Sequence, residues 1–125
     1  MATIKNFEDL EIWKHAKTQA ENIYKLSQSF RNEQFLYNQL NAAAGSVMDN
    51  IAEGFERNST KEMIQFLFIS KGSNGEVRSQ LIRAYCFKLL MIEEMNSYKD
   101  LNLQITRQIY SFINYLRSSP FRSKK

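Results

Sequence analysis

Residues that form turns or break helices are scarce in this chain, which has four glycines and one proline among its 125 residues. The proline, Pro120, lies almost at the C-terminus. An all-β or α/β fold needs many more turn residues than these to connect its strands. Because 43% of the residues are hydrophobic and 24% are charged, the chain is apolar enough to fold, and we expect an all-α protein.

Side chains that carry most catalytic and metal chemistry are also scarce. His15 is the only histidine and Cys86 the only cysteine, which excludes a metal site built from His and Cys ligands. The sequence has no phosphate-binding loop, nucleophile elbow or His-Glu-x-x-His motif. Carboxylates for a di-metal bundle site are available, but the Glu-x-x-His motifs that accompany such sites are missing. We therefore predict a protein that is not an enzyme and that holds no metal and no cofactor.

Long apolar runs and targeting patterns are missing as well. No stretch approaches the roughly 18 apolar residues that cross a bilayer, and the N-terminus lacks the basic and then apolar pattern of a secretion signal. The single Cys86 suits a reducing compartment. We expect a cytoplasmic protein without a membrane partner.

What the chain does have is four amphipathic segments with apolar residues at steps of three and four. They cover about residues 9–29, 33–53 and 60–93, and the fourth opens at residues 96–97 and runs to about residue 118. Connections this short force successive helices to run antiparallel. The sequence predicts one antiparallel, up-down-up-down four-helix bundle over residues 1–118, followed by a basic, flexible tail at residues 119–125.

Two helix ends carry recognisable signals. Gly54 is predicted to lie just past the end of the second helix, where a left-handed conformation is needed. Ser59 and Glu62 form a capping-box pattern at the start of the third helix, in which the hydroxyl accepts a free amide hydrogen bond and the carboxylate reaches back.

Small and polar residues occur in the middle of helices two and three, where core bulk is expected. Glycine inside a helix costs about 0.5–1 kcal/mol relative to alanine. One explanation is the close approach of the two helices, and another is a buried polar cluster of Ser46, Asn50, Glu53, Ser73 and Glu76, with Asn74 beside them. A ligand or hinge site at this level is the alternative.

The third helix has a second apolar stripe about a third of a turn from its core face, and the fourth helix has a similar pair. A second apolar face indicates a second partner, so we predict a homo-oligomer. The alternative is one broad core face with Lys71 and Arg78 at its edge. The predicted interface consists of Ile64, Phe68, Ile82, Leu89, Leu103 and Tyr110.

Positive charge is in excess only at the C-terminus. Of the 17 basic residues, four lie after residue 116, and the remaining 13 equal the 13 acidic residues of the chain. A basic tail binds phosphate backbone through counterion release, or it serves only to keep the protein in solution. If the protein binds RNA or DNA, the predicted contacts are Lys71, Arg78, Arg83, Arg117, Arg122, Lys124 and Lys125.

Several motifs resemble those of one bacterial family, the 23S rRNA-intervening-sequence proteins. Its second-helix signature resembles Gln39, Ala43-Ala44 and Ser46 followed by Asn50-Ile51-Ala52-Glu53-Gly54. Further family-like positions are Phe7, Leu10, Trp13, Ala16, Arg57, Ser59, Glu62, Phe66-Leu67, Gly72-Ser73 and Glu76. The resemblance covers about residues 7–92.

This resemblance implies a four-helix bundle that assembles as a homopentamer or a similar ring. It also implies a relation to the accessory proteins of diversity-generating retroelements, in which a basic pentamer contacts reverse transcriptase and nucleic acid. Two functions follow as hypotheses. The chain is a non-catalytic oligomeric module that binds nucleic acid or a ribonucleoprotein, or it is a protein-interaction scaffold that does not bind nucleic acid.

Overall fold

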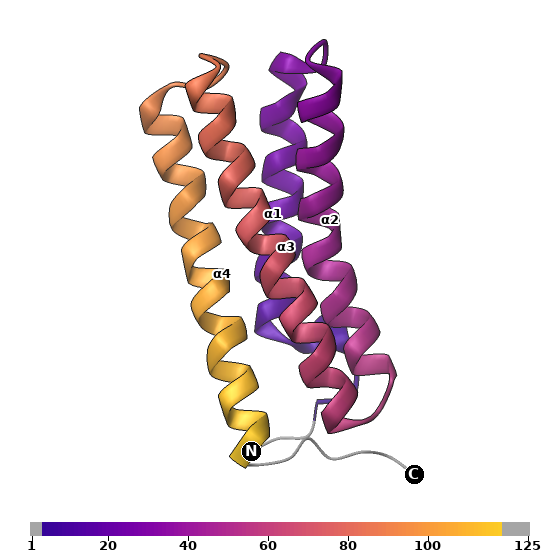
Figure 1. Ribbon diagram of the computed structural model, residues 1–125. Coiled ribbons are helices and arrows are strands. Elements are labelled where there is room, and N and C mark those ends of the chain that lie inside the picture. The colour runs from indigo at the N-terminus through magenta and orange to yellow at the C-terminus, as the bar shows by residue number, and fades with distance from the viewer. Residues whose placement is uncertain (1–3, 119–125) are drawn as a thin grey trace.

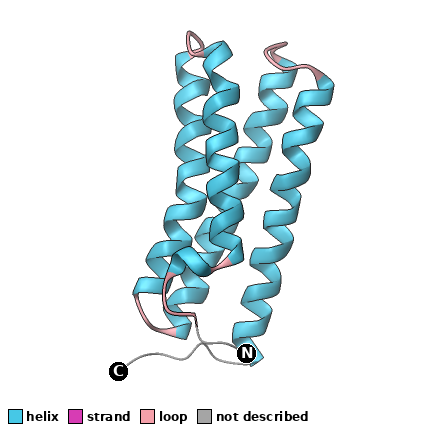
Figure 2. Ribbon diagram, turned by 180° about the vertical axis from the view of Figure 1, so that it is seen from behind, coloured by secondary structure: helices cyan, strands magenta, loops and turns pink. Residues whose placement is uncertain are grey.

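Four long helices form the protein, as the computed structural model shows for residues 4–118 (Figure 1). In chain order the elements are η1 (Phe7–Asp9), α1 (Glu11–Ser27), η2 (Gln28–Phe30), α2 (Gln34–Glu56), α3 (Thr60–Cys86) and α4 (Ile92–Ser118). Successive long helices run in opposite directions and are joined by short loops (Figure 2). The predicted all-α, up-down-up-down bundle is therefore confirmed. Within residues 4–118, no helix is long and apolar enough to cross a membrane.

One core runs along the bundle and takes side chains from all four helices. Ile23 of α1, Leu40 of α2, Leu81 of α3 and Ile109 of α4 are fully buried in it. Burying one such side chain stabilises a fold by about 1.5–3 kcal/mol. Of the four pairs of neighbouring long helices, α2 with α3 has the most extensive contact and α1 with α4 the least.

The third helix is shorter than the sequence pattern suggests. It ends at Cys86 instead of about residue 93, and α4 begins at Ile92, before the predicted start. The chain turns at Lys88, whose φ is 64°. The Leu89 amide donates to the Ala84 carbonyl at 2.9 Å and the Lys88 amide to the Tyr85 carbonyl at 2.9 Å, which is a Schellman motif. Because no glycine marks the end of α3, the apolar residues after Cys86 give the sequence pattern of a helix that continues.

The prediction for Gly54 is wrong. The helix α2 continues past it to Glu56, and Asn58, with φ 58°, takes the left-handed conformation. Gly54 is buried where α2 crosses α3, and a Cβ atom there would lie 2.8 Å from the Cβ of Phe66. Its lack of a side chain lets the two helices touch.

Close approach within the chain does not explain the other glycines. A Cβ added at Gly45, Gly72 or Gly75 would meet no atom within 4 Å. These three positions therefore face open space, contrary to the predicted close approach of the two helices.

Candidate interaction surface

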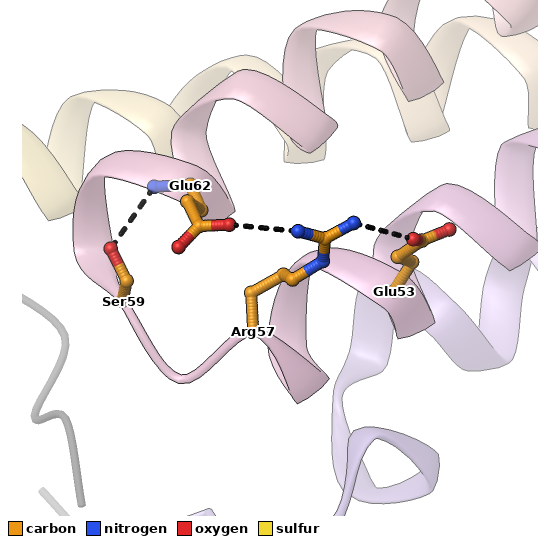
Figure 3. Close-up of polar contacts among 4 residues, drawn as sticks. All are labelled: Glu53, Arg57, Ser59 and Glu62. Carbon is orange, nitrogen blue, oxygen red and sulfur yellow. Dashed lines mark hydrogen bonds and ion pairs between the residues drawn. The ribbon is translucent and has the colours of Figure 1, made fainter. Parts of the chain in front are cut away.

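The turn from α2 to α3 is fixed by a small ionic cluster (Figure 3). The Arg57 guanidinium donates to the Glu53 carboxylate at 3.0 Å and to the Glu62 carboxylate at 3.1 Å. The hydrogen bond to Glu53 raises the pKa of Arg57 above its ordinary value. Ser59 accepts a hydrogen bond from the Glu62 amide at 3.3 Å, which confirms the Ser59 half of the predicted cap. All three charged side chains are about half exposed, so the cluster orders the turn and offers no enclosed site.

The predicted polar cluster between α2 and α3 forms only in part. The Ser46 and Ser73 hydroxyls are 2.8 Å apart, and the Asn50 amide donates to the Ser46 hydroxyl at 2.9 Å. Glu53 instead pairs with Arg57, and Glu76 is exposed and contacts Gln80 at 3.4 Å. Both carboxylates lie outside the cluster because each stays hydrated at the surface, where a charge costs least.

A larger buried network joins α1, α3 and α4. Asn102 donates to the Gln19 side-chain oxygen at 2.9 Å, and Gln19 donates to Asn74 Oδ1 at 2.9 Å. Asn74 in turn donates to the Asn102 carbonyl at 2.8 Å and to the Thr106 hydroxyl at 2.8 Å. The three amide side chains are at most 2% exposed. Their mutual pairing fixes the register of the three helices, because any shift would leave buried amides without partners.

Sequence reasoning found only Asn74 of this network. The available signal was a polar residue at a core position of the helical pattern. Asn102 lies seven residues after the buried Met95, and Gln19 lies between the buried Ala16 and Ile23. Spacing alone does not tell which buried amides meet across helices.

The outer side of the α3–α4 pair carries the second apolar stripe. Positions four and three residues apart follow one side of a helix, and those of α3 lie next to its core stripe. We call this surface the α3–α4 seam. From α3 it takes Ile64, Phe68, Lys71, Gly75, Arg78, Ile82 and Tyr85, and from α4 it takes Lys99, Leu103, Thr106, Tyr110 and Arg117.

Contacts across the seam show that the two stripes meet. The Arg117 guanidinium lies over the Phe68 ring, 5.5 Å from its centroid. The Arg78 guanidinium donates to the Asn102 side-chain oxygen at 2.8 Å and so connects the seam to the buried network. Phe68 is 45% exposed, Ile82 39% and Tyr110 53%, so the chain's own helices do not cover these three side chains. Ile64 and Leu103 of the same stripe are partly buried.

The seam is positively charged. It holds Lys71, Arg78, Lys99 and Arg117, and none of its positions is Asp or Glu. Among residues 4–118, no ion pair involves any of these four cations. Such a surface fits an anionic or acidic partner.

The sequence-predicted interaction residues therefore gather on one surface. Lys71, Arg78 and Arg117, predicted as nucleic-acid contacts, lie on the same seam as the residues predicted for self-association. Arg83 is exposed, three residues after Gln80, which bonds to Gln39 of α2, and it lies away from the seam. Arg122, Lys124 and Lys125 lie outside the described residues.

Two of the residues predicted for the oligomer interface, Ile64 and Leu89, are partly buried and pack against the core. Ile64 still belongs to the seam, but Leu89 does not. It does not continue the α3 stripe, because the helix ends at Cys86. Instead it lies in the turn and packs against the core.

The described residues contain no group of three His, Cys, Asp or Glu side chains that could hold a metal ion. A surface hollow of about 380 Å³ lies at the α3–α4 turn, beside Cys86 and Lys88. His15, the single histidine, lies 2.9 Å from the Gln108 side-chain oxygen and links α1 to α4.

This arrangement defines the chain as an antiparallel four-helix bundle protein with one exposed, basic and apolar seam. The family model described as "23S rRNA-intervening sequence protein" matches residues 8–111. The chain belongs to the 23S rRNA-intervening sequence protein family.

One solved structure supports the same fold. It is the crystal structure of a protein of unknown function from the S23 ribosomal protein family of Bacteroides thetaiotaomicron. The two chains share 21% sequence identity with a TM-score of 0.76, over 82% of this chain and 97% of the other. No curated protein matches the sequence.

Proposed function

We propose that the chain is a non-catalytic binding module that works as an assembly of several copies. The observation that carries this proposal is the α3–α4 seam, along which Phe68, Ile82 and Tyr110 are exposed and Arg117 lies over the Phe68 ring. Exposed contiguous apolar surface on a folded chain marks an interaction site. Aromatic residues and arginine are also the residue types enriched at protein interfaces.

The spacing on the seam favours a helical partner. Its α3 positions repeat at steps of four and three, which is the spacing that lets a helix pack along another helix. The seam is formed by two antiparallel helices, so a third helix can pack along both of them. A second copy of this chain supplies such helices at the same concentration.

Light scattering coupled to size-exclusion chromatography tests the self-association. The mass at tens of micromolar is expected to be a multiple of the 14.7 kDa chain. Phe68→Ser and Ile82→Ser are expected to yield monomers. The matched control is Ile69→Ser, because Ile69 is 51% exposed on the same helix but lies off the seam. A monomeric wild-type protein at this concentration contradicts the proposal.

Nucleic-acid binding is a second candidate, favoured by the four seam cations without a carboxylate and by the rRNA named in the family's description. The family resemblance implies a relation to the accessory proteins of diversity-generating retroelements, and that implied relation is in line with this candidate. In an assembly, Arg83 and the tail residues Arg122, Lys124 and Lys125 are repeated in every copy, and the affinities of weak contacts combine.

Binding of labelled RNA and DNA at several salt concentrations tests this candidate. The logarithm of the binding constant is expected to fall linearly with the logarithm of salt concentration, by about 0.7–0.9 for each phosphate contacted. Arg83→Gln is expected to reduce that slope, whereas Gln65→Glu on the same helix serves as a control for folding. Absence of binding at low salt, or a flat salt dependence, would contradict nucleic-acid binding. Protein interaction would then be the remaining proposed function.

A further inference from the structure

The outward side of α2 carries a stripe of its own, which the bundle does not cover. It runs at steps of three and four, opposite the core side of the helix. We call this stripe the α2 outer face, and it consists of Phe35, Asn38, Ala42, Gly45, Asp49, Ala52 and Glu56. Phe35 is 67% exposed, and no position of the face is Lys or Arg.

The α2 outer face and the α3–α4 seam match in length and are opposite in charge. Each runs for roughly 21 residues, about 31 Å at the rise of an α-helix. The face carries Asp49 and Glu56, and among residues 4–118 neither of them forms an ion pair. All charged residues of the seam are basic.

Both surfaces also contain a glycine that the single chain does not explain. Gly45 and Gly75 lie inside helices, and a Cβ at either would meet nothing within 4 Å. A helical glycine in open space costs helix stability and gains nothing in the monomer. Small residues at a contact between two helices shorten the distance between their axes.

We propose that the α2 outer face of one copy lies in the α3–α4 seam of the next copy. This inference rests on the proposed self-association and names the two surfaces that meet. The order of residues along the helices supports it when the bundle axes are parallel. The end of α2, the start of α3 and the end of α4 lie at the same end of the bundle (Figure 1).

In this arrangement Asp49 and Glu56 lie near Lys71 and Arg117. At the opposite end, Phe35 lies near Ile82 and Tyr85. The small residues Ala42 and Gly45 are at the level of Gly75. Opposite charges, apolar ends and small residues therefore each meet their complement in one register.

Other occupants leave part of this pattern unexplained. Two seams facing each other would place cation against cation, which costs binding energy. A nucleic-acid strand would pair with the cations but would leave the aliphatic Ile82 and Leu103 uncovered. It would also give the acidic α2 outer face no role.

The contact is head-to-tail, because the two surfaces differ and belong to different helices of the bundle. A head-to-tail contact repeats from copy to copy until the rotation closes a ring. Each copy then uses both surfaces, and the assembly has no free seam.

Charge reversal and mixing test the proposal on the full chain. A seam variant carries Lys71→Glu and Arg117→Glu, and an α2 variant carries Asp49→Lys and Glu56→Lys. Arg107→Glu is the matched control, an exposed arginine of α4 outside the seam. Each double variant is expected to be a helical monomer by circular dichroism and light scattering, with self-association weakened at least about a hundredfold.

The decisive measurement is the mixture. The seam variant keeps an intact α2 outer face and the α2 variant keeps an intact seam. The reversed charges on their other two surfaces also complement each other, so equimolar mixing is expected to restore assemblies in which the two variants alternate. A chain with all four reversals is expected to assemble again. If a reversal unfolds the protein, the neutral pairs Lys71→Gln with Arg117→Gln and Asp49→Asn with Glu56→Gln replace it, and each is expected to weaken association about tenfold.

Failure of this inference is distinct from failure of the proposed function. A wild-type protein that is monomeric contradicts both the proposed self-association and the contact inferred here. If the wild type assembles and the α2 variant still assembles like the Arg107→Glu control, self-association stands and the α2 outer face is not its partner. If both variants are monomeric but their mixture stays monomeric, the head-to-tail contact is wrong.

Discussion

At the scale of single residues, Gly54 shows how much one missing side chain decides. The contact between α2 and α3 at this point leaves no room for a methyl group. Gly54→Ala is expected to destabilise the fold by about 1–3 kcal/mol, because overpacking pushes the helices apart. Urea unfolding followed by circular dichroism measures the change.

Gly72→Ala is the matched control for this substitution, because the position is exposed in the middle of α3 and faces open space. It is expected to stabilise the fold by about 0.5–1 kcal/mol through helix propensity alone. Equal effects of the two substitutions would show that Gly54 is not needed for the helix contact.

Asn102 is the residue on which most of the buried network depends. Asn102→Ala removes the partners of Gln19, Asn74 and Arg78 at once and leaves buried polar groups unpaired. Each such group costs about 1–3 kcal/mol, so we expect a loss near the upper end of that range. Thermal and urea unfolding measure it, with Gln104→Ala on the exposed side of α4 as the control. A loss no larger than that of the control would mean that the network adds nothing to stability.

At the scale of the helices, the end of α3 depends on an unusual residue. Lys88 is held at positive φ, where a residue other than glycine is strained. Lys88→Gly is expected to raise the free energy of unfolding by about 0.5–1 kcal/mol, whereas Gln65→Gly inside α3 is expected to lower it by about 1 kcal/mol. A destabilising Lys88→Gly would show that the lysine side chain contributes more than its backbone strain costs.

Helix number, direction and core face could be predicted from the sequence, because the three-and-four spacing reports directly on burial. The predictions that were wrong concern features that depend on contacts between helices or on the backbone conformation of a single residue. The role of Gly54 depends on the distance to Phe66, and the end of α3 depends on a left-handed lysine that no propensity indicates. Seam residues such as Phe68 and Ile82 were found because they break the pattern of a one-sided helix. The α2 outer face was missed, since small and acidic residues look like ordinary surface.

At the scale of the whole molecule, Gly75 separates folding from assembly. Its position in the middle of α3 lowers the stability of the isolated chain. The proposed contact with the next copy explains why a glycine is nevertheless found there. Gly75→Ala is therefore expected to act in opposite directions. It raises the helix stability of the monomer by about 0.5–1 kcal/mol, and it weakens self-association about tenfold because the added methyl group keeps the neighbouring helix away.

Two measurements on the same protein check both parts of this prediction. Urea unfolding in the background of the seam variant reports the stability of the monomer, and sedimentation at several concentrations reports the assembly of the otherwise unchanged chain. Gly72→Ala on the same helix is expected to give the gain in stability without the loss of association, because it lies outside the seam. A Gly75→Ala protein that assembles as tightly as the wild type would mean that the neighbouring copy does not approach α3 at this point.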